Sequence, residues 1–183
     1  MNCWILQSNP NKYRWFDAMR EQWNKPDTWS SAYIFRYVDE IKPQDISYIW
    51  LSNEYEPKTE TIYNPQAKKF EKVLDERKLT SKVKRHRGIY AMAEVTGVPD
   101  PNRGRFNWEY KYWIDKQERD RLSQYPRLEI KYTNAELINN PILKDELEAA
   151  GLGNLLIFRM PRRGIFKLAE EECESIMKLV KKR

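Results

Sequence analysis

Two kinds of side chain in this sequence could do chemistry together: aromatic rings and basic groups. The 183 residues include seven Trp, eleven Tyr and six Phe, and the net charge is +6. A planar base stacks on an aromatic ring with about 1–3 kcal/mol per base, and Lys and Arg hold the phosphates beside it. The combination points towards a nucleic-acid ligand, although composition by itself does not decide the matter.

The aromatic residues gather in two places that could offer a ring to a base. Four of them alternate with polar residues, which predicts a strand over 106–114 with four rings on one face. These rings are Phe106, Trp108, Tyr110 and Tyr112. Trp29 lies in the polar stretch 27–31, where a loop is expected and a large ring is harder to explain as core. A buried face remains the alternative interpretation of the 106–114 pattern.

The basic residues are concentrated. Between positions 82 and 105, six basic side chains face only two acidic ones, and these six are Lys82, Lys84, Arg85, Arg87, Arg103 and Arg105. A second cluster contains Arg159, Arg162 and Arg163. We expect the first six, with Arg162 and Arg163, to contact a nucleic-acid backbone. A solvated surface is the alternative, and mixed charge of this density is also typical of thermophilic proteins.

The residues that most enzymes need are scarce. With one His, two Cys and six scattered Gly, the sequence has no phosphate-binding loop and no recognisable catalytic spacing. Asp115 and Glu118 do not match a nuclease motif, and the stretch around them is interpreted as a polar strand end. We therefore expect a recognition protein without catalytic residues, cofactor or metal. His86 is expected to contact phosphate or solvent.

The cysteines and the hydropathy suggest the cellular location of the chain. Cys3 and Cys173 are interpreted as unpaired, buried small hydrophobic residues of a reducing cytoplasm. No apolar run approaches the roughly 20 residues of a membrane span, so no membrane contact is expected.

The hydrophobic spacing predicts the elements that must position these groups. Strands are predicted over 3–7, 31–38, 46–51, 88–98, 106–114, 128–132, 155–160 and 165–168. Helices are predicted over 13–23, 66–79, 141–150 and 169–182. The mixture indicates an α+β domain with a curved sheet or small barrel surrounded by helices.

Five motifs in order make the sequence resemble a known family. They are the opening WILQSNP at 4–10, DTWSS at 27–31, IKPQDI at 41–46, GIYAMAEV at 88–95, and LIFR at 156–159 with GIFKL at 164–168. Together they are similar to the EVE domain of the PUA-like superfamily, which also contains the YTH domains. The resemblance runs from residue 3 to about 180 and implies one domain over 1–183. An inserted helix and basic segment at about 56–87 are expected in addition.

The resemblance implies a twisted sheet of roughly six strands and a modified base flipped into an aromatic cage. Matched position by position, it places Ser8 and Asn9 at the base edge and Trp29, followed by Ser30, as the first cage ring. The second ring falls on Trp108, with Phe106 or Tyr110 as alternatives. Tyr13 occupies a further base-facing position where the family usually has a polar residue.

The same resemblance suggests a cellular role. The chain is similar to the N-terminal DNA-recognition domain of an archaeal-style McrB-type restriction system. A GTPase motor in cis and a nuclease subunit in trans would then lie outside this sequence. N6-methyladenine in DNA is the favoured ligand, and methylated cytosine or a modified base in RNA are the alternatives. A third possibility is a protein-interaction domain that uses the aromatic strand and the 169–182 helix.

Overall fold

Hydrophobic side chains alternate along the central strands and bury both faces of one twisted sheet. The computed structural model describes residues 1–52, 59–74, 86–134, 136–160 and 163–183. Six strands follow one another across the sheet: β2 (Asp27–Ser30), β7 (Arg127–Asn134), β6 (Gly88–Asp100), β3 (Ile46–Leu51), β1 (Cys3–Ser8) and β9 (Ile165–Lys167). A seventh, β8 (Ile142–Leu143), pairs with β6. β1 and β3 are parallel, whereas the other pairs in this sheet are antiparallel.

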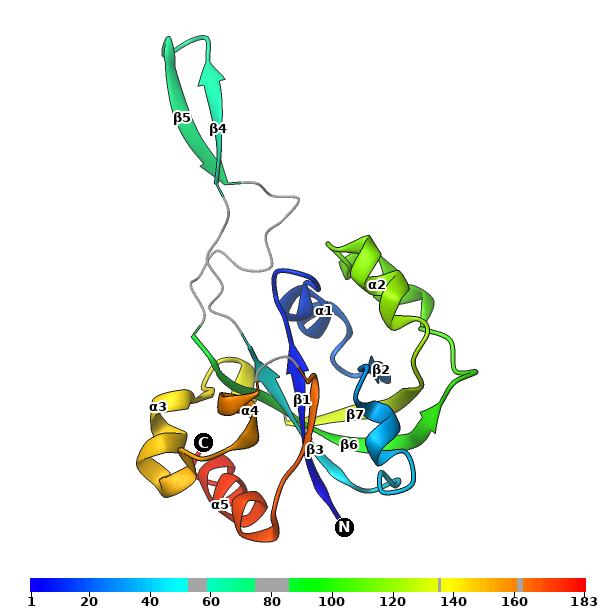
Figure 1. The fold of residues 1–183 in the computed structure, drawn as a ribbon. Coiled ribbons are helices and arrows are strands. Elements are labelled where there is room, and N and C mark those ends of the chain that lie inside the picture. The colour runs from blue at the N-terminus through cyan, green and yellow to red at the C-terminus, as the bar shows by residue number, and fades with distance from the viewer. Residues whose placement is uncertain (53–58, 75–85, 135, 161–162) are drawn as a thin grey trace.

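The sheet has two different faces, as the alternation along β1 illustrates. Trp4 and Leu6 point into one core, which we call the first face, and Cys3 and Ile5 point into the other, which we call the second face. The elements near the first face are α1 (Trp15–Gln22), η1 (Ile34–Tyr37), η2 (Asn107–Tyr112) and α2 (Lys116–Leu122). The second face is covered by α3 (Lys144–Leu147), η4 (Glu148–Leu152), α4 (Leu156–Arg159) and α5 (Glu170–Val180), and η3 (Glu136–Ile138) contributes Leu137 (Figure 1).

The predicted α+β class and twisted sheet are confirmed, and so are most of the predicted strands. Those over 3–7, 46–51, 88–98, 128–132 and 165–168 correspond to β1, β3, β6, β7 and β9. The helices predicted over 13–23 and 169–182 correspond to α1 and α5. These elements carry the longest regular patterns of apolar residues.

The strand predicted over 31–38 is wrong. The strand in this region is β2, which ends at Ser30, and Ile34–Tyr37 form the 3-10 helix η1. Trp29 therefore lies on a sheet strand, opposite Leu128 of β7, and not in a loop. The hydroxyl of Ser31 explains the change of direction, because it accepts a hydrogen bond from the backbone N–H of Tyr33 at 3.1 Å.

The aromatic strand predicted over 106–114 is also wrong. Residues 107–112 form the 3-10 helix η2, and the Glu109 carboxylate accepts the backbone N–H of Phe106 at 3.2 Å at its start. Helical spacing then directs Trp108 and Tyr112 to the core and leaves Tyr110 45% exposed. The four rings do not share one face.

The helix predicted over 66–79 is replaced, within the described residues 66–74, by part of a hairpin of β4 (Thr59–Asn64) and β5 (Lys69–Leu74) (Figure 1), and residues 75–79 lie outside the described residues. The Asn64 side chain accepts the backbone N–H groups of Gln66 and Ala67, which turns the chain. Lys68, with a φ of 51°, completes the turn. The expected basic residues Lys82, Lys84 and Arg85 lie outside the described residues.

Three shorter predictions also differ from the structure. Where a strand was predicted over 155–160, Leu156–Arg159 form the helix α4, because a short apolar run has no period that separates the two. The helix predicted over 141–150 starts only at Lys144, after the short strand β8. The polar strand end around Asp115 is a helix, α2, since the Asp115 carboxylate accepts the backbone N–H of Glu118 at 2.9 Å.

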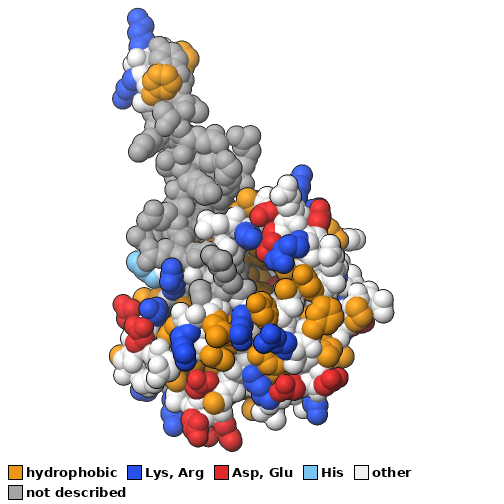
Figure 2. Space-filling view, in the orientation of Figure 1, with side chains coloured by type: hydrophobic (Ala, Val, Ile, Leu, Met, Phe, Trp, Pro, Cys, Tyr) orange, Lys and Arg blue, Asp and Glu red, His pale blue; other side chains and the backbone are white. Residues whose placement is uncertain are grey.

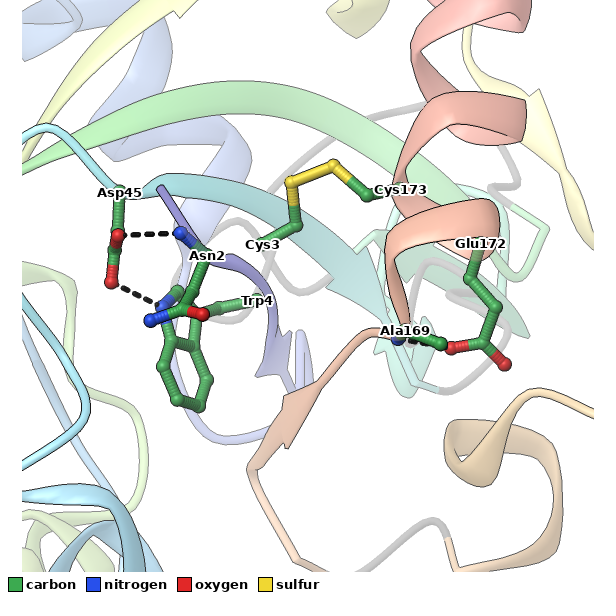
Figure 3. The surroundings of a disulfide bond; sticks show 7 residues. All are labelled: Asn2, Cys3, Trp4, Asp45, Ala169, Glu172 and Cys173. Carbon is green, nitrogen blue, oxygen red and sulfur yellow. Dashed lines mark hydrogen bonds between the residues drawn. A yellow bond between two sulfur atoms is a disulfide. The ribbon is translucent and has the colours of Figure 1, made fainter.

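The two cysteines are paired, contrary to the expectation that they would be free. Cys3 of β1 and Cys173 of α5 form a disulfide with their Cα atoms 5.9 Å apart (Figure 3). The pairing follows from the fold, because the second-face core packs α5 against β1 and brings the two ends of the chain together. Closing a loop of 170 residues stabilises the folded chain by up to about 5 kcal/mol.

Candidate functional site

A cavity of about 680 Å³ opens beside the first face of the sheet. It lies between the end of β1, the strand β2, the start of η2, the helix α2 and the turn at 163–164. Figure 2 shows basic and hydrophobic side chains side by side on the surface in view. The volume is within the usual range for small-molecule sites and can hold a nucleobase.

The sequence-predicted base-edge residues Ser8 and Asn9 line this cavity. The Ser8 carbonyl is held by Ser52, whose backbone N–H and hydroxyl donate to it at 3.0 and 2.9 Å. The Asn9 carbonyl accepts the backbone N–H groups of Lys12 and Tyr13 at 3.0 and 3.1 Å. The chain therefore leaves β1 in a fixed turn that holds both side chains at the cavity wall.

Trp29 and Ser30 line the same cavity from β2. Trp29 is 9% exposed. The Ser30 hydroxyl donates to the carbonyl of Leu122 in α2 at 3.2 Å, which ties the helix to the strand. The structure thus brings Ser8, Asn9, Tyr13, Trp29 and Ser30 together around one space.

Trp113 also lines the cavity, together with Trp29, Tyr13 and Tyr33, and sequence reasoning missed it. Trp108, Phe106 and Tyr110 are not among the lining residues, and the Trp108 ring packs edge-on against Tyr112 with centroids 6.0 Å apart. In a strand, position 113 would face away from the even-numbered rings. Capping of residues 107–112 by Glu109 was the sequence signal that could have suggested helical spacing instead.

Trp113 contacts two neighbouring side chains. Its ring centroid is 5.1 Å from that of Tyr13, and the Arg105 guanidinium lies 4.7 Å from the ring centroid. The Trp113 indole N–H is buried and has no hydrogen-bond partner among the described residues. A donor of this kind is available to a ligand in the cavity.

The inner wall of the cavity contains two buried carboxyl groups, Asp27 and Glu109. Asp27 accepts the Tyr132 hydroxyl at 2.5 Å and the backbone N–H of Thr28 at 2.8 Å. The Glu109 carboxylate accepts the Thr28 hydroxyl at 2.8 Å and lies 3.5 Å from an Arg105 guanidinium nitrogen. Two acidic groups and one arginine therefore lie close together in the cavity lining.

Burial controls the protonation of this cluster. Loss of solvent, reinforced by the charge of Glu109, raises the pKa of Asp27 to about 8. Loss of solvent also raises the pKa of Glu109, although hydrogen bonding from Thr28 and the charge of Arg105 oppose the change. Burial and the charge of Glu109 both favour the protonated form of Asp27.

Two tyrosines face the same acidic cluster. Burial and the charge of Asp27 raise the pKa of both Tyr13 and Tyr132 well above the ordinary value. Tyr132 is anchored on both sides, since it also accepts the Trp15 indole N–H at 3.2 Å. The Tyr13 hydroxyl is buried and has no hydrogen-bond partner among the described residues.

The predicted phosphate-contacting residues are distributed unevenly. Arg105 and Arg163 line the cavity, whereas Arg103 and Arg87 do not. Arg103 donates to the carbonyls of Val98 and Arg127 at 2.6 and 2.8 Å, so it joins β6 to β7. Arg87 is exposed near the start of β6, and Arg162 lies outside the described residues.

Two further cations, not predicted from the sequence, also line the cavity. Lys12 and Arg121 are both paired with Glu118, at 3.2 and 2.7 Å. Arg163 instead lies over the Tyr33 ring, 5.4 Å from its centroid. Among the charged lining residues, Lys12, Arg121 and Arg163 therefore accompany Glu118, whereas Arg105 is paired with Glu109.

Other classes of site receive no support from the described residues. No three His, Cys, Asp or Glu side chains in the described ranges are grouped to hold a metal ion. Among the same residues, no helix is both long and apolar enough to cross a membrane.

This chain matches a known family and resembles several solved structures. The EVE domain family model matches residues 2–179. The structure resembles human THYN1 in complex with DNA that contains 5-methylcytosine, with a TM-score of 0.57 and 14% identity over 98% of this chain and 97% of that one. It also resembles a hypothetical protein from Leishmania major, with a TM-score of 0.59 and 16% identity over 100% and 96% of the two chains.

The DUF55 domain of human thymocyte nuclear protein 1 is a third similar structure, with a TM-score of 0.56 and 13% identity over 96% of each chain. No curated protein sequence matches this chain. At these identities the structural likeness establishes a shared fold, and the family match covers nearly the whole sequence. The chain belongs to the EVE domain family.

Proposed function

We propose that this protein reads a modified base in DNA by accepting the flipped base into the cavity beside the first face. Residues 1–183 act as one recognition module and carry no catalytic step. The observation that carries the proposal is the cavity itself, in which Trp29 and Trp113 line a space that also contains Ser8 and Asn9.

The cavity has the chemistry that a flipped base needs. Extrusion of a base costs a few kcal/mol of unstacking and unpairing. Stacking on aromatic rings returns about 1–3 kcal/mol per base, and a cation near the ring holds the phosphates. Arg163 stands in the lining for that purpose, and the unpartnered Trp113 N–H and Tyr13 hydroxyl can bind polar atoms of the base.

The favoured base is N6-methyladenine. The order of Ser8, Asn9 and Trp29 resembles the YTH cage, which supports a methylated amine beside aromatic rings. One methyl group in an apolar pocket contributes only about 1–3 kcal/mol of discrimination. We therefore expect a preference for the modified base over a salt-sensitive background of unmodified DNA binding.

Methylated cytosine is the second candidate, and a specific observation favours it. Human THYN1, which shares the fold, has been crystallised with DNA that contains 5-methylcytosine. A modified base in RNA would use the same rings and charges, and competition between matched DNA and RNA strands separates the two.

The cellular setting is proposed on the resemblance. The module would deliver modified DNA to an McrB-type GTPase motor in cis and a nuclease subunit in trans, in the cytoplasm of an archaeal-type cell. A disulfide is compatible with that setting, because intracellular proteins of hyperthermophilic archaea contain many of them.

Fluorescence anisotropy with duplexes that differ in a single methyl group tests the proposal. One panel carries N6-methyladenine, 5-methylcytosine or no modification at the same site. The native protein should bind one methylated duplex about ten-fold more tightly than the unmodified duplex. Equal affinity for all three duplexes at every salt concentration would contradict it.

The variant Trp29→Ala should abolish the preference and keep most of the affinity for unmodified DNA. The matched control is Trp23→Ala, because Trp23 is 40% exposed and does not line the cavity. It should retain the preference. Thermal unfolding of both variants separates a lost ring from a lost fold.

A further inference from the structure

The carboxyl group of Asp27 is the most unusual polar group in the cavity lining. Asp27 is 2% exposed, and among the described residues its side chain has no ion-pair partner. Its two oxygens accept the Tyr132 hydroxyl and the Thr28 backbone N–H, which fixes the orientation of the carboxyl group. Each oxygen retains a further position for a proton or a donor.

The neighbours of Asp27 decide its charge. Glu109 is the better partner for the buried cation, since it receives the Thr28 hydroxyl, the Phe106 N–H and the Arg105 guanidinium. Arg127 also faces Glu109. Two carboxylates this close would repel each other in a buried site, so the second group keeps its proton.

The other titratable groups around Asp27 do not reverse this assignment. Tyr13 and Tyr132 face it as neutral phenols, because burial holds their pKa values above the ordinary range. The charge of Arg105 lowers the pKa of Asp27, but by less than burial and the charge of Glu109 raise it. The cluster as a whole therefore places an acid, and not a carboxylate, at the inner wall of the cavity.

A carboxylic acid has one O–H donor and one carbonyl acceptor side by side. Adenine and cytosine have the matching pair on their pairing edge, a ring-nitrogen acceptor next to an amino donor. Guanine and thymine have an N–H at that ring nitrogen and a carbonyl beside it, so they pair with the acid only when its proton lies on the other oxygen. An N6-methylated adenine still retains one amino N–H, and 5-methylation leaves the pairing edge of cytosine unchanged.

We propose that Asp27 reads the pairing edge of the flipped base as a carboxylic acid, donating to the ring nitrogen and accepting from the adjacent amino group. The residue thereby matches the pairing edge of methylated adenine or cytosine. This inference rests on the proposed function, which concerns the aromatic rings and the methyl group, and adds the residue that selects the edge.

The test is a double-mutant cycle between Asp27 and the ring nitrogen. One probe duplex carries N6-methyladenine, and the other carries its 1-deaza analogue, in which the ring nitrogen is replaced by C–H. The native protein should bind the analogue about 10-fold more weakly, because the buried donor loses its partner. Asp27→Ala should bind both probes with the same reduced affinity.

Asp27→Asn provides the matched variant that keeps a donor and an acceptor. It should bind the N6-methyladenine probe within a few-fold of the native protein at pH 6.5. Native affinity should fall as the pH rises from 7 to 9, while that of Asp27→Asn should stay level. Asp120→Asn makes the same substitution at an exposed side chain and should behave like the native protein.

The outcomes distinguish this inference from the proposed function. If the native protein prefers a methylated duplex but Asp27→Ala still discriminates the 1-deaza analogue, the role of Asp27 is overturned. If Asp27→Ala does not fold, a pH dependence that persists unchanged in Asp27→Asn overturns it equally. If the native protein shows no preference for any methylated duplex, the proposed function fails and Asp27 fails with it.

Discussion

The two faces of the central sheet are built from the same strands but differ in what they bury. The second face is closed by α3, η4, α4 and α5 over a core of aliphatic and aromatic side chains, and the Cys3–Cys173 disulfide crosses it. The first face buries carboxyl groups, an arginine and tyrosine hydroxyls next to a cavity.

The difference has an energetic meaning. An unpartnered buried polar group costs about 1–3 kcal/mol, so a fold keeps such groups only where something offsets them. Among the described residues, the second face has unpartnered polar atoms at Tyr48 and beside it at Arg183, whereas the first face places Tyr13, Trp113 and Arg105 with unpartnered polar atoms together at one cavity. The second face thus serves stability, and the first face gives up stability at the place where a ligand would bind.

Removing the disulfide should affect the second face alone. The double variant Cys3→Ala/Cys173→Ala should lose about 2–5 kcal/mol of unfolding free energy, because the unfolded chain regains the freedom of a long loop. Urea denaturation measures this loss. DNA binding at 25 °C should be unchanged, and a loss of methyl preference in the folded variant would show that the two faces are not separate.

Replacing Asp27 should reduce the dependence of the unfolding free energy on pH. The pKa of Asp27 is about 8 when folded against 3.8 for an ordinary carboxyl, so the folded protein holds a proton that the unfolded chain releases above about pH 4. The contribution of Asp27 to stability is therefore full below that pH and declines as the pH rises towards about 8.

Asp27→Asn should therefore flatten the decline in unfolding free energy between pH 5 and pH 8. Part of the slope should remain, since the pKa of Glu109 is raised as well. Denaturation at several pH values compares the two proteins. The same pH slope in native and variant protein would show that Asp27 is ionised in the folded state.

The two tryptophans of the η2 region give the smallest contrast. Trp113→Ala should cost the modified duplex about 1–3 kcal/mol of binding, because Trp113 lines the cavity. Trp108→Ala should lower the melting temperature and leave the methyl preference intact, because Trp108 packs against the core. If anisotropy showed a lost methyl preference for Trp108→Ala and a retained one for Trp113→Ala, the second cage ring would be Trp108, as the resemblance implies.

The sequence could predict the sheet and part of the cavity for one reason. Strands such as Ile46–Leu51 have long regular patterns, and Ser8, Asn9, Trp29 and Ser30 sit in motifs that follow those strands directly. Trp113 was missed because the polar–aromatic alternation at 106–112 suggested a strand, while a local cap at Glu109 set a helical turn.

Long-range contacts account for the remaining differences. The acidic pair depends on η2 packing beside β2, which brings Thr28 and Glu109 together across 81 positions of sequence. The disulfide likewise joins residues that are 170 positions apart. Neither contact leaves a local pattern, so each becomes visible only once the fold is known.

The central claim, that a base leaves the duplex and enters the first-face cavity, is tested most directly by 2-aminopurine fluorescence. The fluorophore is placed next to the target base in otherwise identical methylated and unmethylated duplexes. Native protein should raise the fluorescence with the methylated duplex well above that with the unmethylated one, and Trp29→Ala should not. Saturating binding to the methylated duplex without a rise in fluorescence would contradict the account.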